Sequence, residues 1–409
     1  MPRRQGQSVP MPSHQQRRRP RAVVPLLAGL VVAAIVGGVW AATATPTSSH
    51  ARATGGAATQ PVAEPSAPPG PPACAAVVAG LSERDRLAQR LMVGVDAADP
   101  VGAAEIVRTA HVGGIFVGGK ATALLRNDKL AAVQSAAALP VTVAVDDEGG
   151  RVQRIDKLDG SMPSARRMAA SMTPEQVRAI GFERGRQLRA RGVTMNFAPT
   201  VDVGARPAGS VIGDRAFSDD PDVVIRYARA FAEGQREAGV TVVLKHFPGH
   251  GHASGDSHKG RVSTPPQDRL ERDDLRPYSA LVGPGGPLAD GSGVMVGHLD
   301  VPGLTDGLPA SLTPAVYRLL RGEYGFDGLV ITDDLGAMKA ISNRFTLPRA
   351  TVTALQAGAD VALSSNVAPA GPVLDALERA LADGTLSAAD NDRAVARVLA
   401  AKGVCVDRS

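Results

Sequence analysis

Eight short apolar runs alternate along the chain with segments of helical pattern, and this alternation limits the fold more than any other feature. The runs are 91–95, 114–117, 141–145, 194–197, 241–245, 294–298, 329–332 and 361–364. Runs that are apolar on both faces are typical of buried parallel strands, and segments such as 174–190 and 221–238 are predicted to be covering helices. Eight such units predict an α/β fold, a (β/α)8 TIM-type barrel.

Polar residues follow these runs at their carboxyl ends. They are Asp146, Asn196, Lys245, His246, His298, Asp333, Ser364 and Ser365. Barrel enzymes build their sites on this face, from the ends of several strands at once. We therefore expect these side chains to gather in one site.

The densest group of polar residues is the stretch 245–258, Lys-His-Phe-Pro-Gly-His-Gly-His-Ala-Ser-Gly-Asp-Ser-His. Lys245 and His246 end an apolar run, and a glycine-rich loop then leads to Asp256 and His258. Such an arrangement is typical of catalytic sites in α/β enzymes. The histidines could instead bind zinc, but their spacing fits no common zinc pattern, and we expect no metal site here.

Four ordered blocks carry a resemblance to a known family. They are 146–154 (Asp-Asp-Glu-Gly-Gly-Arg-Val-Gln-Arg), 196–202 (Asn-Phe-Ala-Pro, ending at Asp202), the stretch 245–258, and 332–335 (Thr-Asp-Asp-Leu). Together they resemble the β-N-acetylglucosaminidase (β-hexosaminidase) branch of glycoside hydrolase family 3, over roughly residues 75–403. The resemblance implies a barrel that is the catalytic domain and a hydrolase of O-glycosidic bonds that needs no cofactor.

The resemblance also implies the catalytic roles. Asp333 matches the nucleophile, a carboxylate that forms a glycosyl-enzyme. Asp334 is expected to support or cap, although either aspartate could be a helix cap. His258 matches the general acid/base, with Asp256 orienting its imidazole, a group that titrates near neutral pH.

Residues of the sugar pocket are carried over in the same way. Those that match the family are Asp146, Arg154, Arg215, Lys245 and His246. Glu148 and Arg151 could form a structural ion pair. Asp147 stands where the family usually has glutamine, Thr332 where it has serine, and His252 where it has aspartate, which leaves the role of His252 open.

The first 73 residues are predicted to direct export. Residues 1–21 are basic, and 22–42 carry no charge and form either a single-pass membrane anchor or a cleaved signal peptide. Residues 43–73 are a Pro/Ala/Gly/Ser/Thr-rich tether. The catalytic domain, 74–409, is thus expected on the outer face of the cytoplasmic membrane or secreted.

Charge and cysteine content agree with an exported glycan enzyme. The net charge of +5 arises from the first 73 residues, which hold seven arginines and one glutamate, so nucleic acid is not an expected partner. The only two cysteines are Cys74 and Cys405. Outside the cytoplasm we expect an intramolecular disulfide between them rather than two free thiols.

Aromatic residues are only 3% of the chain, and its single tryptophan, Trp40, lies in the apolar segment 22–42. Open grooves for long glycans often stack sugars on tryptophan, so this composition favours a pocket for one terminal sugar. We expect a retaining exo-β-N-acetylglucosaminidase that acts on peptidoglycan fragments or other small glycans. The alternatives are a related β-glucosidase, a phosphorylase that uses phosphate in place of water, and an inactive tethered glycan-binding module.

Overall fold

The computed structural model describes residues 74–405. The predicted basic segment, the anchor or signal peptide and the tether, 1–21, 22–42 and 43–73, lie outside the described residues. Within residues 74–405, no helix has both the length and the apolar character that a membrane crossing requires.

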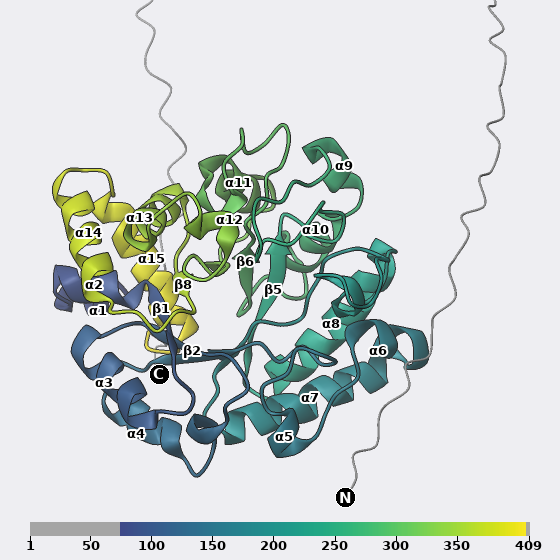
Figure 1. Ribbon diagram of the computed structural model, residues 1–409, viewed down its shortest axis with the longest axis horizontal. Coiled ribbons are helices and arrows are strands. Elements are labelled where there is room, and N and C mark those ends of the chain that lie inside the picture. Colours follow the sequence, from purple (N-terminus) through teal and green to yellow (C-terminus); the bar gives the residue numbers. More distant parts are fainter. Residues whose placement is uncertain (1–73, 406–409) are drawn as a thin grey trace, which may run out of the picture. The chain divides into compact units, whose positions relative to one another are not determined.

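Eight parallel strands form one sheet in the order β7-β6-β5-β4-β3-β2-β1-β8. They are β1 (Leu91–Val95), β2 (Gly114–Val117), β3 (Thr142–Val145), β4 (Met195–Asn196), β5 (Thr241–Phe247), β6 (Gly293–Val296), β7 (Leu329–Thr332) and β8 (Ala362–Ser364). A parallel bridge between Ile331 and Val361 joins the two edges. The predicted (β/α)8 barrel is confirmed, and Figure 1 shows its strands at the centre of the domain with helices outside.

Helices follow the strands and cover the outside of the barrel. The helices are α1 (Ala75–Gly80), α2 (Glu83–Gln89), α3 (Pro100–Ala110), α4 (Lys129–Ser135), α5 (Asp156–Asp159), α6 (Ala165–Ser171), α7 (Pro174–Ala190), α8 (Pro221–Glu237), α9 (Gln267–Arg272), α10 (Arg276–Val282), α11 (Pro314–Arg318), α12 (Lys339–Ser342), α13 (Leu347–Ala357), α14 (Gly371–Ala382) and α15 (Ala388–Ala401). Thr173 and Gln176 form a capping box at the start of α7. A Cβ on Gly181 would lie 2.4 Å from the Phe231 carbonyl oxygen, so glycine allows α7 and α8 to pack closely.

Side chains alternate between the two faces of the strands, which divides the core in two. Val93 and Ile115 point outward and pack against the helices, whereas Met92, Phe116 and Met295 fill the inside of the barrel. Phe116 stacks on Phe197 with ring centroids 5.6 Å apart. The interior is therefore a packed floor beneath the carboxyl ends of the strands, as expected for this fold.

The two ends of the described chain lie close together, because α1 packs against α15. Cys74 and Cys405 form a disulfide there, with Cα atoms 5.0 Å apart. Cys74 is fully buried in a small apolar cluster with Val78 and Leu399.

Candidate active site

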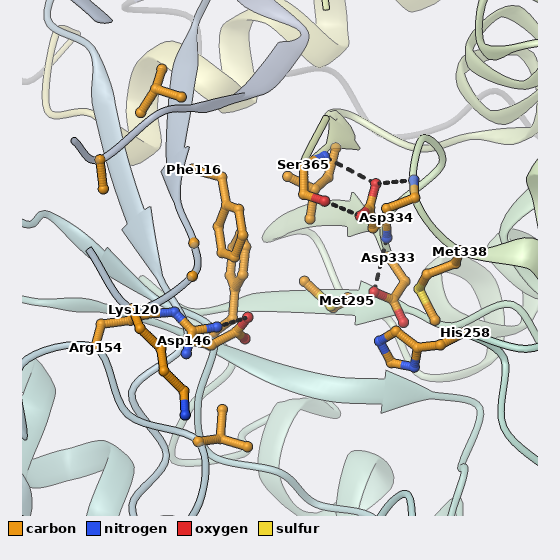
Figure 2. A pocket seen from close by; sticks show the side chains of 18 of the residues that line it. Phe116, Lys120, Asp146, Arg154, His258, Met295, Asp333, Asp334, Met338 and Ser365 are labelled. Atoms are coloured by element: carbon orange, nitrogen blue, oxygen red, sulfur yellow. Dashed lines mark hydrogen bonds and ion pairs between the residues drawn. The ribbon is translucent and has the colours of Figure 1, made fainter. Parts of the chain in front are cut away.

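A pocket of about 780 Å³ opens at the carboxyl ends of the strands. Of the predicted site residues, those that line it are Asp146, Arg154, Arg215, Lys245, His246, His258 and Asp333. Figure 2 shows Asp146 and Arg154 on one side of this pocket and Asp333 with His258 on the other. Asp256 lines a neighbouring cavity of about 440 Å³, and Arg215 and His258 line both cavities.

Some strand-end residues stay out of the pocket because they hold the scaffold together. Asn196 donates to the carbonyl of Asp147 and to the side chain of Gln235. The two ring nitrogens of His298 contact the Ser311 hydroxyl and the Asp334 carbonyl. The expectation that every polar residue at a strand end faces one site was therefore too broad.

One wall of the pocket is a buried cluster of alternating charges. Lys245, near the end of β5, places its Nζ 2.5 Å from both Asp146 Oδ1 and Glu148 Oε1. Arg215, in the short 3-10 helix Gly213–Arg215, binds Glu148 through two hydrogen bonds of 2.7 Å. Burial raises the pKa of Glu148, but Arg215 and Lys245 outweigh it and hold that pKa well below its usual range.

This cluster corrects the suggested ion pair between Glu148 and Arg151. Arg151 instead binds Asp214 at 2.5 Å and donates to backbone carbonyls of the segment 208–212. It thereby holds the chain that leads into Arg215. The pairing of Glu148 with Lys245 and Arg215 was not predicted from the sequence, because these partners come from distant parts of the chain.

Asp146 is the most exposed member of the cluster and lines the open pocket. Its side chain is 22% exposed, whereas that of Glu148 is buried. Arg154 Nη2 lies 3.6 Å from Asp146 Oδ2. Because Asp146 keeps acceptor capacity and Lys245 has a third ammonium proton, this wall can both accept from and donate to sugar hydroxyls.

His246 is held by the buried carboxylate of Asp202. Its Nδ1 lies 2.7 Å from Asp202 Oδ2, and its Nε2 lies 3.4 Å from Arg215 Nη2 at the pocket wall. Burial raises the pKa of Asp202, but interactions with His246 and His250 leave it below its ordinary value. Asp202 closes one of the sequence blocks, yet its orienting role was not predicted.

The two adjacent aspartates after β7 differ in their surroundings. Asp334 accepts hydrogen bonds from the backbone of Gly336, Ala337 and Ser365 and from the Ser365 hydroxyl. Its carboxylate thus ties the loop after β7 to the loop after β8, which agrees with a supporting role.

Asp333 has the freer carboxylate, which accepts from the Asp334 amide at 2.8 Å and otherwise faces the pocket (Figure 2). Burial raises the pKa of Asp333, but charge interactions with His298 and His246 and the Asp334 hydrogen bond outweigh it. The net pKa is below the ordinary value, so Asp333 is ionised at neutral pH, as a nucleophile must be.

His258 lies on the β5 loop, defined here as residues 248–266 between β5 and α9. Its Nδ1 is 3.0 Å from Asp256 Oδ1, and Figure 2 shows the imidazole beside the carboxylate of Asp333. Burial raises the pKa of Asp256, but hydrogen bonds from the His258 amide and ring and from Lys259 outweigh burial, so the net pKa is below the usual value. With Nδ1 directed to Asp256, Nε2 is the nitrogen left to exchange a proton.

The remaining histidines of this loop take part in pairs. His250 Nε2 lies 3.4 Å from Ser257 Oγ, and His252 Nδ1 lies 2.7 Å from Asp274 Oδ2. His252 therefore anchors the loop to the segment before α10. Across residues 74–405, no three His, Cys, Asp or Glu side chains are grouped so that they could hold a metal ion.

Comparison with known proteins connects this geometry to a family. Residues 83–401 match the glycosyl hydrolase family 3 N-terminal domain. The β-hexosaminidase LpqI of Mycobacterium tuberculosis is 48% identical over 396 residues, which cover 94% of this chain and 97% of that protein.

Solved structures of similar proteins belong to the same family. A glycosyl hydrolase of the same family from Mycobacterium smegmatis is 52% identical and superposes with a TM-score of 0.75 over 79% of this chain and 98% of the other. A family 3 β-N-acetylglucosaminidase from Paenibacillus is 33% identical, with a TM-score of 0.72 over 80% of this chain and 63% of the other. The chain therefore belongs to glycoside hydrolase family 3, next to members that are named β-hexosaminidases.

Proposed function

We propose that this glycoside hydrolase is a β-hexosaminidase, specifically a retaining exo-β-N-acetylglucosaminidase that releases terminal, non-reducing N-acetylglucosamine. The observation that carries the proposal is the position of His258 beside Asp333, opposite a wall of sugar-binding charges. A nucleophile and a proton donor on one side of a pocket, with hydroxyl-binding groups on the other, are what cleavage of a terminal glycosidic bond requires. The names of the relatives point to the same sugar.

In the first chemical step, Asp333 attacks the anomeric carbon and forms a glycosyl ester. The bond from that carbon to the glycosidic oxygen breaks, and His258 donates its proton to the departing oxygen. Asp256, 3.0 Å from Nδ1, stabilises the imidazolium before transfer and keeps Nε2 toward the reaction.

In the second step, water attacks the anomeric carbon of the ester. His258, now neutral, accepts the proton of that water, and Asp333 leaves as a carboxylate. Two successive inversions return the original β configuration. The enzyme ends in its starting protonation state, so no cofactor is needed.

Substrate recognition in this proposal rests on Asp146, Arg154, Arg215, Lys245 and His246. Lys245 and Arg215 are paired with the carboxylates of Asp146 and Glu148, so these charges can be buried without a ligand and still exchange hydrogen bonds with hydroxyls. We further propose peptidoglycan fragments as the natural glycan. We also propose that the domain is exported, and that residues 22–42 either anchor it through the tether at 43–73 or are cleaved as a signal peptide.

Turnover of aryl N-acetylglucosaminides is the direct test. We expect hydrolysis of the β-N-acetylglucosaminide, little hydrolysis of the matched β-glucoside, and a first product that is the β anomer. The assay is run with and without inorganic phosphate. Formation of a sugar 1-phosphate would show that the enzyme is a phosphorylase and not a hydrolase. Binding without turnover would support a glycan-binding module.

A further inference from the structure

Ser257, between Asp256 and His258, is buried although its neighbours are not. Its exposed fraction is 1%, compared with 65% for the His258 side chain and 21% for that of Asp256. A polar residue that is buried in the middle of an exposed loop needs partners, and Ser257 has one on each side.

The first partner is the loop that carries the nucleophile. The Ser257 carbonyl accepts the Ala340 amide at 3.0 Å, and Ala340 lies in the first turn of α12. Amides of a first helical turn have no acceptor within the helix, so this bond satisfies a group that would otherwise lack one. Figure 2 shows Met338, from the same loop, beside His258. The β5 loop is thereby docked on the segment that begins at Asp333.

The second partner is His250, whose Nε2 lies 3.4 Å from Ser257 Oγ. The His250 amide donates to Asp202 Oδ1 at 2.7 Å, and Asp202 Oδ2 contacts His246 Nδ1 at 2.7 Å. The rings of His250 and His246 also meet edge to face, with centroids 5.8 Å apart. A continuous chain of contacts therefore runs from the sugar-binding histidine to the centre of the Asp256/His258 pair.

The contact between His250 and Ser257 suits a neutral imidazole. Burial and the nearby His246 lower the pKa of His250 to about 4, so one ring nitrogen is a donor and the other an acceptor at neutral pH. A hydroxyl can donate or accept, so the pair is complementary in either tautomer.

We propose that Ser257, held by His250 and Ala340, is a positioning residue that keeps His258 within reach of the glycosidic oxygen. This inference rests on the proposed role of His258 as acid/base. A loop that is free to swing would spend less time with the imidazole in place, and a displacement of about 1 Å can cost about a hundredfold in rate. The deficit appears only in steps that need a proton.

Ser257→Ala tests the inference, because it removes a single oxygen. Two substrates are compared under conditions in which glycosylation limits the rate: an N-acetylglucosaminyl disaccharide, whose leaving group needs a proton, and an aryl glycoside with a good leaving group. We expect kcat/KM to fall about tenfold or more on the disaccharide and less than about threefold on the aryl glycoside.

Two serine variants serve as controls. Ser254→Ala is on the same loop but exposed, and its hydroxyl only accepts from the Ser263 amide at 3.1 Å, so both activities should remain unchanged. Ser257→Thr retains the hydroxyl and should return most of the disaccharide activity. If Ser257→Ala does not fold, Ser257→Thr takes its place: a loss of activity on the disaccharide that exceeds the loss on the aryl glycoside supports the inference, and equal losses on both substrates contradict it.

His258→Ala, measured in parallel, separates the acid/base role of His258 from the positioning role of Ser257. If His258→Ala affects the disaccharide selectively and Ser257→Ala lowers both activities equally or neither, the positioning role is wrong and the acid/base assignment stands. If His258→Ala itself shows no selectivity, the acid/base assignment fails, and the positioning role fails with it.

Discussion

At the scale of single residues, Asp333 and Asp334 are adjacent, identical side chains in different surroundings, which suit them to different tasks. The Asp334 carboxylate is used by three backbone amides and a hydroxyl, whereas Asp333 accepts one amide and faces the pocket. A nucleophile needs a carboxylate with free acceptor positions, whereas a carboxylate that holds two loops together uses its acceptor positions for hydrogen bonds.

We therefore expect opposite outcomes for the two positions. Asp333→Ala should lower kcat by at least about 10³-fold with little change in melting temperature, because it removes the proposed nucleophile. Asp334→Ala should lower the free energy of unfolding by about 1–3 kcal/mol, because buried amides lose their acceptor. Steady-state kinetics and urea unfolding of both variants check this pair. A covalent sugar adduct trapped on a residue other than Asp333 would refute the nucleophile assignment.

At the scale of elements, the β5 loop is a polar segment held against the barrel by the buried His250 and the partly buried His252. Above about pH 6.5, an unfolded-state histidine is neutral, and so is folded His250, whose pKa is about 4. As the pH falls from 6.5 toward 4, the unfolded state takes up a proton that the folded state does not. The contribution of His250 to the free energy of unfolding is therefore fully present above pH 6.5 and is lost as the pH falls toward 4. The largest loss is about 3 kcal/mol.

His250→Gln should flatten this part of the pH dependence. The free energy of unfolding, measured with urea between pH 7.5 and 4.5, should fall more steeply for the wild type than for the variant. Parallel curves for the wild type and His250→Gln would show that the ring is not kept neutral by the fold.

Strands and strand-end residues were predictable, whereas partners across elements were not. A run that is apolar on both faces marks a parallel strand locally, and a polar residue at its end, such as Asp333, is placed by the strand alone. Glu148 is different, because its pairing with Arg215 depends on how the loop after β3 meets a 3-10 helix more than sixty residues later. His250 and Ser257 were likewise visible as residues, but their contact is set by the path of the β5 loop.

At the scale of the whole domain, two long-range links hold the chain. Strand pairing closes the barrel, and a disulfide joins the two ends of the described chain. The bridge between Ile331 and Val361 joins the last strands, and the Cys74–Cys405 disulfide, across a sequence separation of 331, joins the ends. A cross-link over so long a loop restricts the unfolded chain more than the folded one, and in general contributes about 2–5 kcal/mol. Its stabilisation should therefore be global, unlike that of Asp334 or His250.

A double-mutant cycle on the two cysteines measures this contribution. Cys405→Ala should lower the free energy of unfolding by about 2–5 kcal/mol. Cys74→Ala should cost slightly more, because Cys74 is also buried against Val78 and Leu399. The double variant should be no less stable than Cys74→Ala, since a bond can be lost only once and the effects of coupled residues do not add. Reduction of the wild type should reproduce Cys405→Ala. Additive losses, or two thiols that are alkylated without prior reduction, would mean that the ends are held by packing alone.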